Sequence, residues 1–322
     1  MKEIIIDSQK RLDSFCLGGE VPAGSVVALG LFDGVHLAHR ELLHAARKRA
    51  DELSSLLSVF TFSLDSAALK PSSKRIYTDT ERASILDSLG VDYTVSVNFE
   101  LIADYTGEQF VKKILIEGFA ARAAAAGFNF RFGRGASCGK DELIKLLCEY
   151  GKDTIVINEY LSGGVTLSSS YIRKLIAAKK MREAAMLLGL PYFSESKVSH
   201  GIGLGSRLGI PTVNTETKLN SAIPTGVYST VVRIGDQNYL GLTNVGTCPT
   251  FGQREVHAET LILNFDHDIY DKNIRIFFLD YLRDEKKFSS PEELIMQINV
   301  DKNKALELIG DLKWQEIGQN LQ

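Results

Sequence analysis

The chain has 322 residues, of which 44% are hydrophobic and 24% charged, and this balance predicts globular cores in two domains or in one large one. The net charge of −3 and the lack of a long basic run argue against a nucleic-acid partner and an anionic-membrane partner. The four cysteines show no paired spacing and no apolar run suits a signal peptide or a membrane span, so we expect a soluble cytoplasmic protein without a zinc site or a disulfide framework.

Strand and helix patterns alternate through the first part of the chain. Apolar and β-branched runs predict strands at 25–29, 55–62, 91–99 and 153–158. The context predicts an alanine-rich strand that leads into a loop at 121–133, although alanine by itself favours a helix. Helical spacing and capping residues predict helices at 39–53, 78–90, 106–119, 141–151 and 168–178. This alternation predicts an α/β domain with a parallel sheet and helices on its faces.

The pattern changes near Pro191, after which strands are separated by turn clusters. The predicted strands are 226–235, 238–246, 257–265 and 273–283. Such hairpin-linked strands indicate an antiparallel β-barrel. A closing helix at about 291–311 follows, with Ser290 as its cap and Pro291 at its first position. We place the domain boundary at about residue 188, which gives domains 1–187 and 188–322.

The stretch "LGLFDGVHLAHRELL" (29–43) leaves a buried strand through a turn at Gly30 and Gly34 and enters a helix. Free N–H groups and the positive end of the dipole make such a helix start suitable for a phosphate. His36 and His39 are three residues apart and share a helical face. Two alternatives stay open, namely two partly exposed polar residues, or a zinc site for which no third ligand is evident nearby.

A second anion signal lies in "TLSSSYIRKLI" (166–176). Ser169 and Ser170 precede a helix, and Arg173 follows one turn later. Hydroxyls, free N–H groups and a guanidinium converge there, although a plain helix cap has the same appearance. Together with the histidine loop, the stretch favours triphosphate binding.

These stretches and "GFNFRFG" (127–133) resemble the adenylyltransferase module of the prokaryotic bifunctional riboflavin kinase/FAD synthetase (riboflavin kinase/FMN adenylyltransferase) family. "HGIGLGSRLGIPTVN" (200–214), "HAETLILNF" (257–265) and "IYDKNIRIFFLDYLRDEKKF" (269–288) resemble its riboflavin kinase module. The resemblance implies that riboflavin and MgATP give FMN in the barrel, and that FMN and MgATP then give FAD and pyrophosphate in the first domain. The implied partners are riboflavin, FMN and ATP, and the implied metal is Mg²⁺.

The resemblance also implies roles in the first domain. His36 and His39 would be catalytic at the α-phosphate of ATP, and Asn129 matches a flavin-binding position. The implied ATP-binding residues are Gly30, Phe32, Asp33, Gly34, Ser169, Ser170 and Arg173. Ala38 stands where the family motif H-x-G-H has glycine.

In the second domain, glycines would let the backbone approach the phosphates, and they are Gly203, Gly205 and Gly209. Thr212 and Asn214 offer neutral oxygens for Mg²⁺ and phosphate, with turn chemistry after Pro211 as the alternative. Glu259 alternates with apolar residues on its strand, so we expect it on the inner face of the barrel.

The resemblance makes Glu259 the base that takes the proton from the terminal ribityl hydroxyl of riboflavin. Arg283 either contacts the flavin or nucleotide, or pairs at the surface with Asp284 or Glu285.

Three other functions stay open at this stage. In the first, only one of the two modules is active, because Ala38 weakens the adenylyltransferase. The chain could be a non-catalytic flavin-binding regulator, although an intact set of Thr212, Asn214 and Glu259 argues against that. The first domain alone could be another small-molecule nucleotidyltransferase, which the attached barrel disfavours. The oligomeric state does not follow from the sequence.

Overall fold

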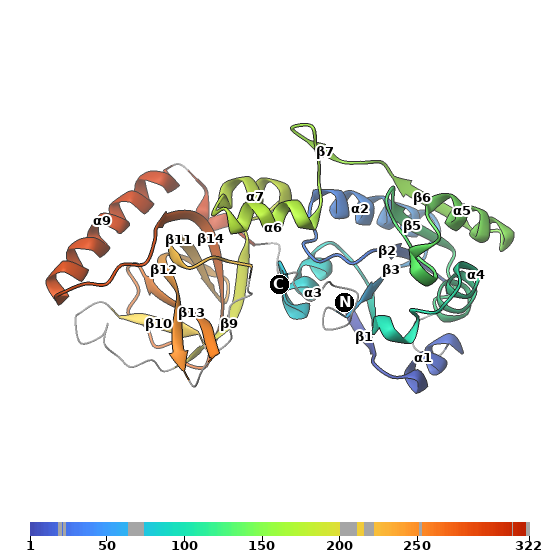
Figure 1. Cartoon of the computed structure of the whole chain (residues 1–322), viewed down its shortest axis with the longest axis horizontal. Helices are drawn as coiled ribbons and strands as arrows, with labels where there is room; N and C mark the ends of the chain where they lie inside the picture. Colours follow the sequence, from blue (N-terminus) through green and yellow to red (C-terminus); the bar gives the residue numbers. More distant parts are fainter. Residues whose placement is uncertain are drawn as a thin grey trace. The chain divides into compact units, whose positions relative to one another are not determined.

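The computed structural model describes residues 1–18, 21, 24–63, 74–199, 211–215, 222–250, 253–310 and 312–319. It divides into two compact units (Figure 1). Unit 1 comprises residues 1–73, 77–169 and 320–322, and unit 2 comprises residues 74–76 and 170–319. The domain limits 1–187 and 188–322 stay a prediction.

Unit 1 contains a parallel sheet, as predicted, and the sheet has the order β1-β4-β3-β2-β5-β6, in which β1 is a strand that the sequence analysis did not predict. The strands are β1 (Lys2–Ile6), β2 (Ser25–Leu29), β3 (Leu56–Phe62), β4 (Tyr93–Val97), β5 (Ala123–Gly127) and β6 (Asp153–Ile157). The central strand β2 is buried along its whole length, because helices cover both faces of the sheet. A short hairpin, β7 (Leu161–Ser162) with β8 (Val165–Thr166), follows β6.

The helices of unit 1 are α1 (Gln9–Cys16), α2 (Leu37–Glu52), α3 (Asp79–Ser88), α4 (Gly107–Gln109) and α5 (Lys140–Glu149). They are followed by α6 (Ser169–Ala177), which starts at the last residue of this part of unit 1, and by α7 (Met181–Leu188) of unit 2. The sequence analysis did not predict α1 and α7. The predicted helix at 106–119 is present, but Phe110–Gly118 (η2) is a π-helix. Short 3₁₀ turns are η1 (Phe99–Leu101), η3 (Arg134–Ala136) and η4 (Trp314–Glu316).

Unit 2 is built on a closed antiparallel barrel, as predicted, in the order β10-β13-β12-β11-β14-β9. Its strands are β9 (Phe193–Ser199), β10 (Thr212–Thr215), β11 (Gly226–Ile234), β12 (Gln237–Thr250), β13 (Gln253–Ile262) and β14 (Asn273–Arg283). The closing helix α9 (Pro291–Ile309) begins as predicted, with the Ser290 hydroxyl accepting from the N–H of Glu293 and with Pro291 in the first turn.

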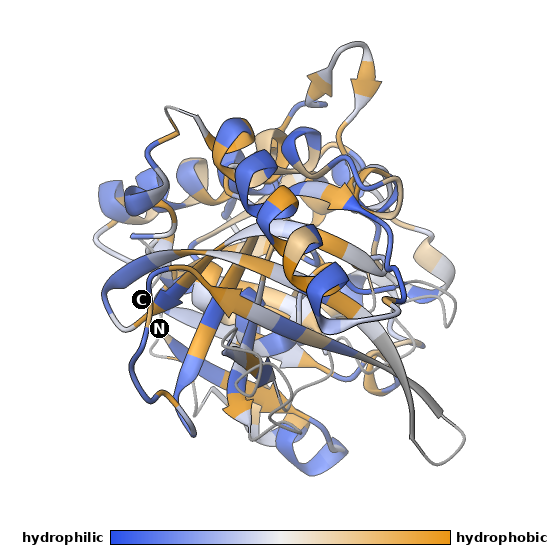
Figure 2. Ribbon diagram, turned by 90° about the vertical axis from the view of Figure 1, so that its left-hand side faces the viewer, coloured by the Kyte–Doolittle hydropathy of each residue, from blue (hydrophilic) through white to orange (hydrophobic). Residues whose placement is uncertain are grey.

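The inside of the barrel is a packed core that includes a chain of hydroxyl groups. Thr230, Thr243 and Thr260 are fully buried and are joined by hydrogen bonds of 2.9 Å. On the outer wall, Ala305 of α9 packs with Leu242 and Leu282. Figure 2 colours the ribbon by hydropathy and shows hydrophobic and hydrophilic segments on both strands and helices. Helix α9 therefore covers one outer face of the barrel.

Candidate active sites

The loop between β2 and α2 brings the two histidines to a helix start. Helix α2 begins at Leu37, two residues earlier than predicted, so His36 is its N-cap residue and His39 lies in the first turn. The two imidazole rings are stacked, with centroids 3.8 Å apart and planes 10° from parallel. The predicted shared face is therefore confirmed.

Burial determines the charge of this pair. Burial lowers the pKa of His36 to about 4. It also lowers the pKa of His39 well below its ordinary value, and the charge of a protonated His36 would lower that pKa further. The Nδ1 atoms of both rings are buried and have no hydrogen-bond partner within the part of the chain that the structure describes. Near neutral pH both imidazoles are therefore uncharged, and each carries one N–H group.

A cavity of unit 1 opens at this helix start and gathers several of the predicted residues. Its lining includes Gly30, His36, His39, Asn129 and Ser169. The side chains of Phe32 and Asp33 are buried within the loop, at 0% and 1% exposure, and Gly34 is buried beside them. Ser170 and Arg173 are not among the described residues that line the cavity, and the guanidinium of Arg173 donates to the Ser170 hydroxyl at 3.0 Å.

The sequence did not single out the aromatic lining of this cavity. The aromatic residues are Phe60, Phe62, Phe99, Phe128, Phe130 and Tyr160. Phe60 and Phe62 lie at the carboxyl end of β3, the edge of an open parallel sheet at which ligands bind. The position of an aromatic residue at a strand end was the signal that could have found them.

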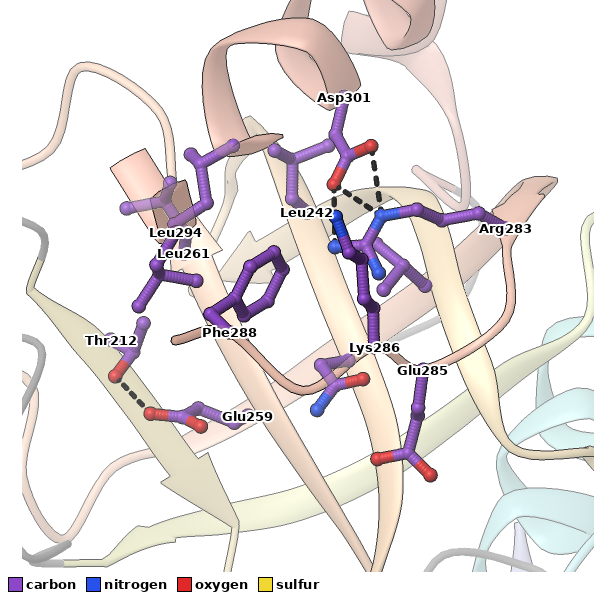
Figure 3. Close-up of a pocket in the computed structure, with 13 residues that line it drawn as sticks. Thr212, Leu242, Glu259, Leu261, Arg283, Glu285, Lys286, Phe288, Leu294 and Asp301 are labelled. Atoms are coloured by element: carbon purple, nitrogen blue, oxygen red, sulfur yellow. Dashed lines mark hydrogen bonds and ion pairs between the residues drawn. The ribbon is translucent and has the colours of Figure 1, made fainter. Parts of the chain in front are cut away.

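A second cavity lies in unit 2, between the barrel wall and α9 (Figure 3). Thr212 of β10 donates a hydrogen bond from its hydroxyl to Oε1 of Glu259 at 2.6 Å. Glu259 of β13 stands opposite Asn214 on one neighbouring strand and Asn244 on the other. Residues directly opposite in antiparallel strands share a face, so these four polar side chains form one group.

The predicted position of Glu259 on the inner face of the barrel is wrong. Its strand neighbours Ala258 and Thr260 are fully buried inside, whereas Glu259 is exposed. Alternation along a strand then places Glu259 on the outer wall. The apolar Leu261 shares that wall because it packs, as Ile298 of α9 does, against the cluster that contains Leu242 and Ala305. The alternating pattern therefore arises where the helix covers the wall.

Arg283 also lines this cavity, but its partner differs from the alternatives considered. It forms a paired contact with Asp301 of α9, with Nε at 2.9 Å from Oδ2 and Nη2 at 2.9 Å from Oδ2. Asp301 is 3% exposed, and Gln297 donates to its Oδ1. Among the described residues, Arg283 therefore pairs with Asp301 and not with the side chain of Asp284 or Glu285. The flavin contact of Arg283 stays a prediction.

Asn244, Phe288 and Asp301 complete the cavity and were missed by the sequence analysis. Gly203, Gly205 and Gly209 lie outside the described residues. Within the described ranges, no group of three or more His, Cys, Asp or Glu side chains could hold a metal ion.

Comparisons with known proteins agree with this arrangement. Residues 19–171 match the FAD synthetase family model, and residues 188–309 match the riboflavin kinase model. The bifunctional riboflavin kinase/FMN adenylyltransferase of Escherichia coli K12 is 31% identical over 292 residues, which cover 89% of this chain and 93% of that protein. The protein of the same name from Bacillus subtilis 168 is 32% identical over 306 residues, covering 91% of this chain and 95% of the relative.

The chain belongs to the bifunctional riboflavin kinase/FMN adenylyltransferase family. The histidine cavity lies within the FAD synthetase match, and the barrel cavity lies within the riboflavin kinase match. A solved structure described as a macrolide-efflux protein from Streptococcus pneumoniae also resembles this family member, with a TM-score of 0.82 and 30% identity over 95% of this chain and 99% of that chain. In the described ranges, no helix has the length and apolar character to cross a membrane.

The buried neutral histidines predict that this riboflavin kinase/FMN adenylyltransferase family member loses stability in mild acid. An unfolded His36 takes up a proton near pH 6.5, whereas the folded one does so near pH 4. Between these values the unfolded state binds more protons, so the free energy of unfolding falls as the pH falls. At about 1.4 kcal/mol per pKa unit, His36 alone contributes a loss on the order of 2 kcal/mol between pH 7.5 and pH 5.

Urea unfolding of unit 1 at the two pH values measures this effect. The variant His36→Asn is expected to lose less stability than the parent over the same range. His44, an exposed residue of the same helix, provides the control His44→Asn, which keeps the parent's loss. The same loss of stability in His36→Asn as in the parent contradicts the assignment of the effect to His36.

Proposed function

We propose that the chain converts riboflavin to FMN in the barrel cavity and FMN to FAD in the histidine cavity, with MgATP as the co-substrate of both steps. The observation that carries the proposal is the presence of both sites on one chain, each inside its own family match. Both reactions are attacks on phosphorus, in which positioning and charge stabilisation supply most of the catalysis.

In the barrel, Glu259 acts as the general base. The terminal ribityl hydroxyl of riboflavin attacks the γ-phosphorus of ATP, ADP leaves, and the hydroxyl proton goes to the Glu259 carboxylate. The 2.6 Å hydrogen bond from Thr212 to Oε1 fixes the orientation of that carboxylate. Asp301 holds Arg283 at the opposite side of the same cavity, where its guanidinium can contact flavin or nucleotide.

The residues around Glu259 fit Mg²⁺. The hydroxyl of Thr212 and the amide of Asn214 offer only oxygen as a ligand atom suited to this ion, and they share a face of the barrel wall with the carboxylate. Thr212 and Asn214 would hold the metal together with phosphate oxygens. When bound, Mg²⁺ neutralises charge on the phosphates.

In unit 1, a phosphate oxygen of FMN attacks the α-phosphorus of ATP, and pyrophosphate leaves. The neutral imidazoles of His36 and His39 each have an N–H group that can donate to an α-phosphate oxygen. The start of α2 adds free N–H groups and its dipole. Asn129 and the aromatic residues line the same cavity, and they would contact the flavin.

The test is chromatography of the products after incubation with riboflavin and MgATP. We expect both FMN and FAD. FMN alone would show that only the kinase module is active, and neither product would favour a flavin-binding regulator. The cytoplasmic location stays a prediction, which suits an enzyme that consumes ATP.

Ala38 provides a test of the one-module alternative. It lies between His36 and His39 in the first turn of α2 and lines the cavity. Because its methyl group lines the cavity that would hold the nucleotide, we expect Ala38→Gly to lower the ATP concentration needed for FMN-to-FAD conversion, by up to about tenfold. Misplacement of reacting groups by about 1 Å can cost roughly 10²-fold.

ATP dependence of FAD formation, measured for parent and Ala38→Gly, decides the point, with the kinase activity of the same sample as the internal control. An unchanged or poorer ATP dependence in the glycine variant would mean that Ala38 does not weaken the adenylyltransferase. Glycine would then only destabilise the helix start by its greater freedom in the unfolded chain.

A further inference from the structure

Unit 1 contains a fully buried arginine that the proposed chemistry does not use. Arg82 of α3 is 1% exposed. A guanidinium is costly to bury unless its N–H groups are hydrogen-bonded. Its Nη2 contacts Asp79 at 2.6 Å, and its Nη1 donates to the carbonyl oxygen of Leu31 at 3.1 Å. The same nitrogen donates to the Thr61 hydroxyl and to the carbonyl of Phe62, both at 3.3 Å.

The Leu31 carbonyl receives a second hydrogen bond from the same region. The hydroxyl of Thr61 donates to it at 2.9 Å, so Arg82 and Thr61 together satisfy both lone pairs of this oxygen. Thr61 is fully buried and belongs to β3, while Arg82 belongs to α3. Two rigid elements therefore hold one carbonyl of the loop between β2 and α2.

The loop segment that follows Leu31 has an unfavourable backbone conformation. Phe32, directly after Leu31, has a φ of +53°, and Val35 has a φ of +40°. Left-handed conformations of residues with a Cβ cost about 1–3 kcal/mol each and persist where the surroundings fix them. The two hydrogen bonds to Leu31 fix the peptide that precedes the first of these residues.

Direct contacts connect the Phe32 ring to the histidine pair. The Phe32 ring lies under Gly30, where an added Cβ would be 3.1 Å from the ring edge. The centroid of the Phe32 ring is 4.9 Å from that of His39, and His39 stacks on His36 at 3.8 Å. A change at Leu31 therefore reaches the imidazoles through one aromatic ring.

We propose that Arg82, with Thr61, is the positioning residue of the adenylyl-transfer site, holding the Leu31 carbonyl so that His36 and His39 are stacked and aligned before nucleotide binds. The inference rests on the proposed adenylyltransferase function. Arg82 is not itself a lining residue of the cavity, and it acts through the backbone carbonyls of Leu31 and Phe62, which are lining residues.

The test uses Arg82→Lys and Thr61→Val in the full chain. Lysine keeps the charge but replaces the planar guanidinium fork, which donates from several nitrogens, by one ammonium nitrogen. Valine keeps the shape of threonine without its hydroxyl. We expect each variant to lower kcat for FMN-to-FAD conversion on the order of 10- to 100-fold, because the reacting groups depend on alignment. Riboflavin kinase activity stays at the parent's level. Arg47→Lys is the matched control, since Arg47 of α2 contacts Asp92 and the carbonyl of Ser55.

Two further measurements separate positioning from simple stability. The double variant is expected to lose no more adenylyl-transfer activity than the more impaired single variant, since both changes act on one carbonyl. The imidazole proton resonances of His36 and His39, assigned with His36→Asn and His39→Asn, are expected to lose the ring-current shifts of the stacked pair in both variants. The other histidine resonances stay in place.

Parent-like FAD formation in Thr61→Val, additive losses in the double variant, or unchanged imidazole shifts would each overturn the proposal. Thr61→Val decides the matter if Arg82→Lys does not fold. A parent chain that forms no FAD would instead refute the proposed adenylyltransferase function, and the imidazole shifts would still decide whether Arg82 and Thr61 position the pair.

Discussion

Replacing Glu259 by glutamine is expected to stop the conversion of riboflavin to FMN while FMN-to-FAD conversion continues. Glutamine keeps the size of the side chain and can still accept the hydrogen bond that Thr212 donates at 2.6 Å. It cannot take the proton of the ribityl hydroxyl. Loss of a general base typically costs about 10²–10⁴-fold in rate. Because the histidine cavity belongs to the other unit, its reaction does not depend on this carboxylate.

The measurement is the rate of FMN formation from riboflavin, with FAD formation from added FMN as the internal reference. Glu307→Gln, an exposed glutamate of α9, is the matched control and keeps the parent's rate. FMN formation close to the parent's rate in Glu259→Gln would remove Glu259 from the role of base. A parallel loss of both activities with a lower unfolding temperature would indicate a structural role.

Local patterns predicted the parallel sheet and the antiparallel barrel, although β1, β9 and β10 were not among the predicted strands. The alanine-rich stretch 121–133 favours a helix by propensity, yet the alternation of strands and helices around it predicted a strand, and Ala123–Gly127 is β5. A cap at Thr78 or Asp79 predicted the start of α3, and the structure has Thr78 as the N-cap residue, within a capping box with Glu81 that the sequence analysis did not identify. Spacing along the chain also predicted the shared face of His36 and His39.

Contacts between distant segments were not predictable in the same way. Alternation shows that Glu259 and Leu261 share a strand face, but it does not show which face is inside the barrel. The answer depends on α9, which covers part of the outer wall and makes an apolar residue suitable there. Likewise, nothing in the local sequence pairs Arg283 with Asp301, because the partner is brought in by the packing of that helix.

The same reason explains why Arg82 was not singled out from the sequence. An arginine four residues after Thr78, in the first turns of a helix, has the appearance of a surface residue. Only the fold places it beneath the loop that carries His36, where its N–H groups reach the Leu31 carbonyl. Residues that position a catalytic loop from behind are therefore the part of the site that a single sequence shows least.

Replacing His36 by alanine is expected to lower FAD synthesis on the order of 10²- to 10³-fold and to leave FMN synthesis unchanged. The variant removes an N–H donor from the cavity, and a donor aimed at developing charge contributes about that much. It also removes the ring that stacks on His39 at 3.8 Å, so the remaining imidazole loses its fixed orientation.

Removing the buried neutral ring is expected to reduce the loss of stability in acid. A general loss of structure would instead lower the stability at every pH, so the two effects can be distinguished. His36 no longer penalises the folded state below pH 6.5, so the variant keeps more of its stability at pH 5 than the parent does. His44→Ala, on the exposed face of α2, controls for the loss of any histidine from that helix. The deciding measurement is kcat for each half-reaction beside an unfolding curve. Equal loss of both activities with a lowered melting temperature would make His36 a structural residue, because only a role at the adenylyl-transfer step separates FAD formation from FMN formation on the same chain.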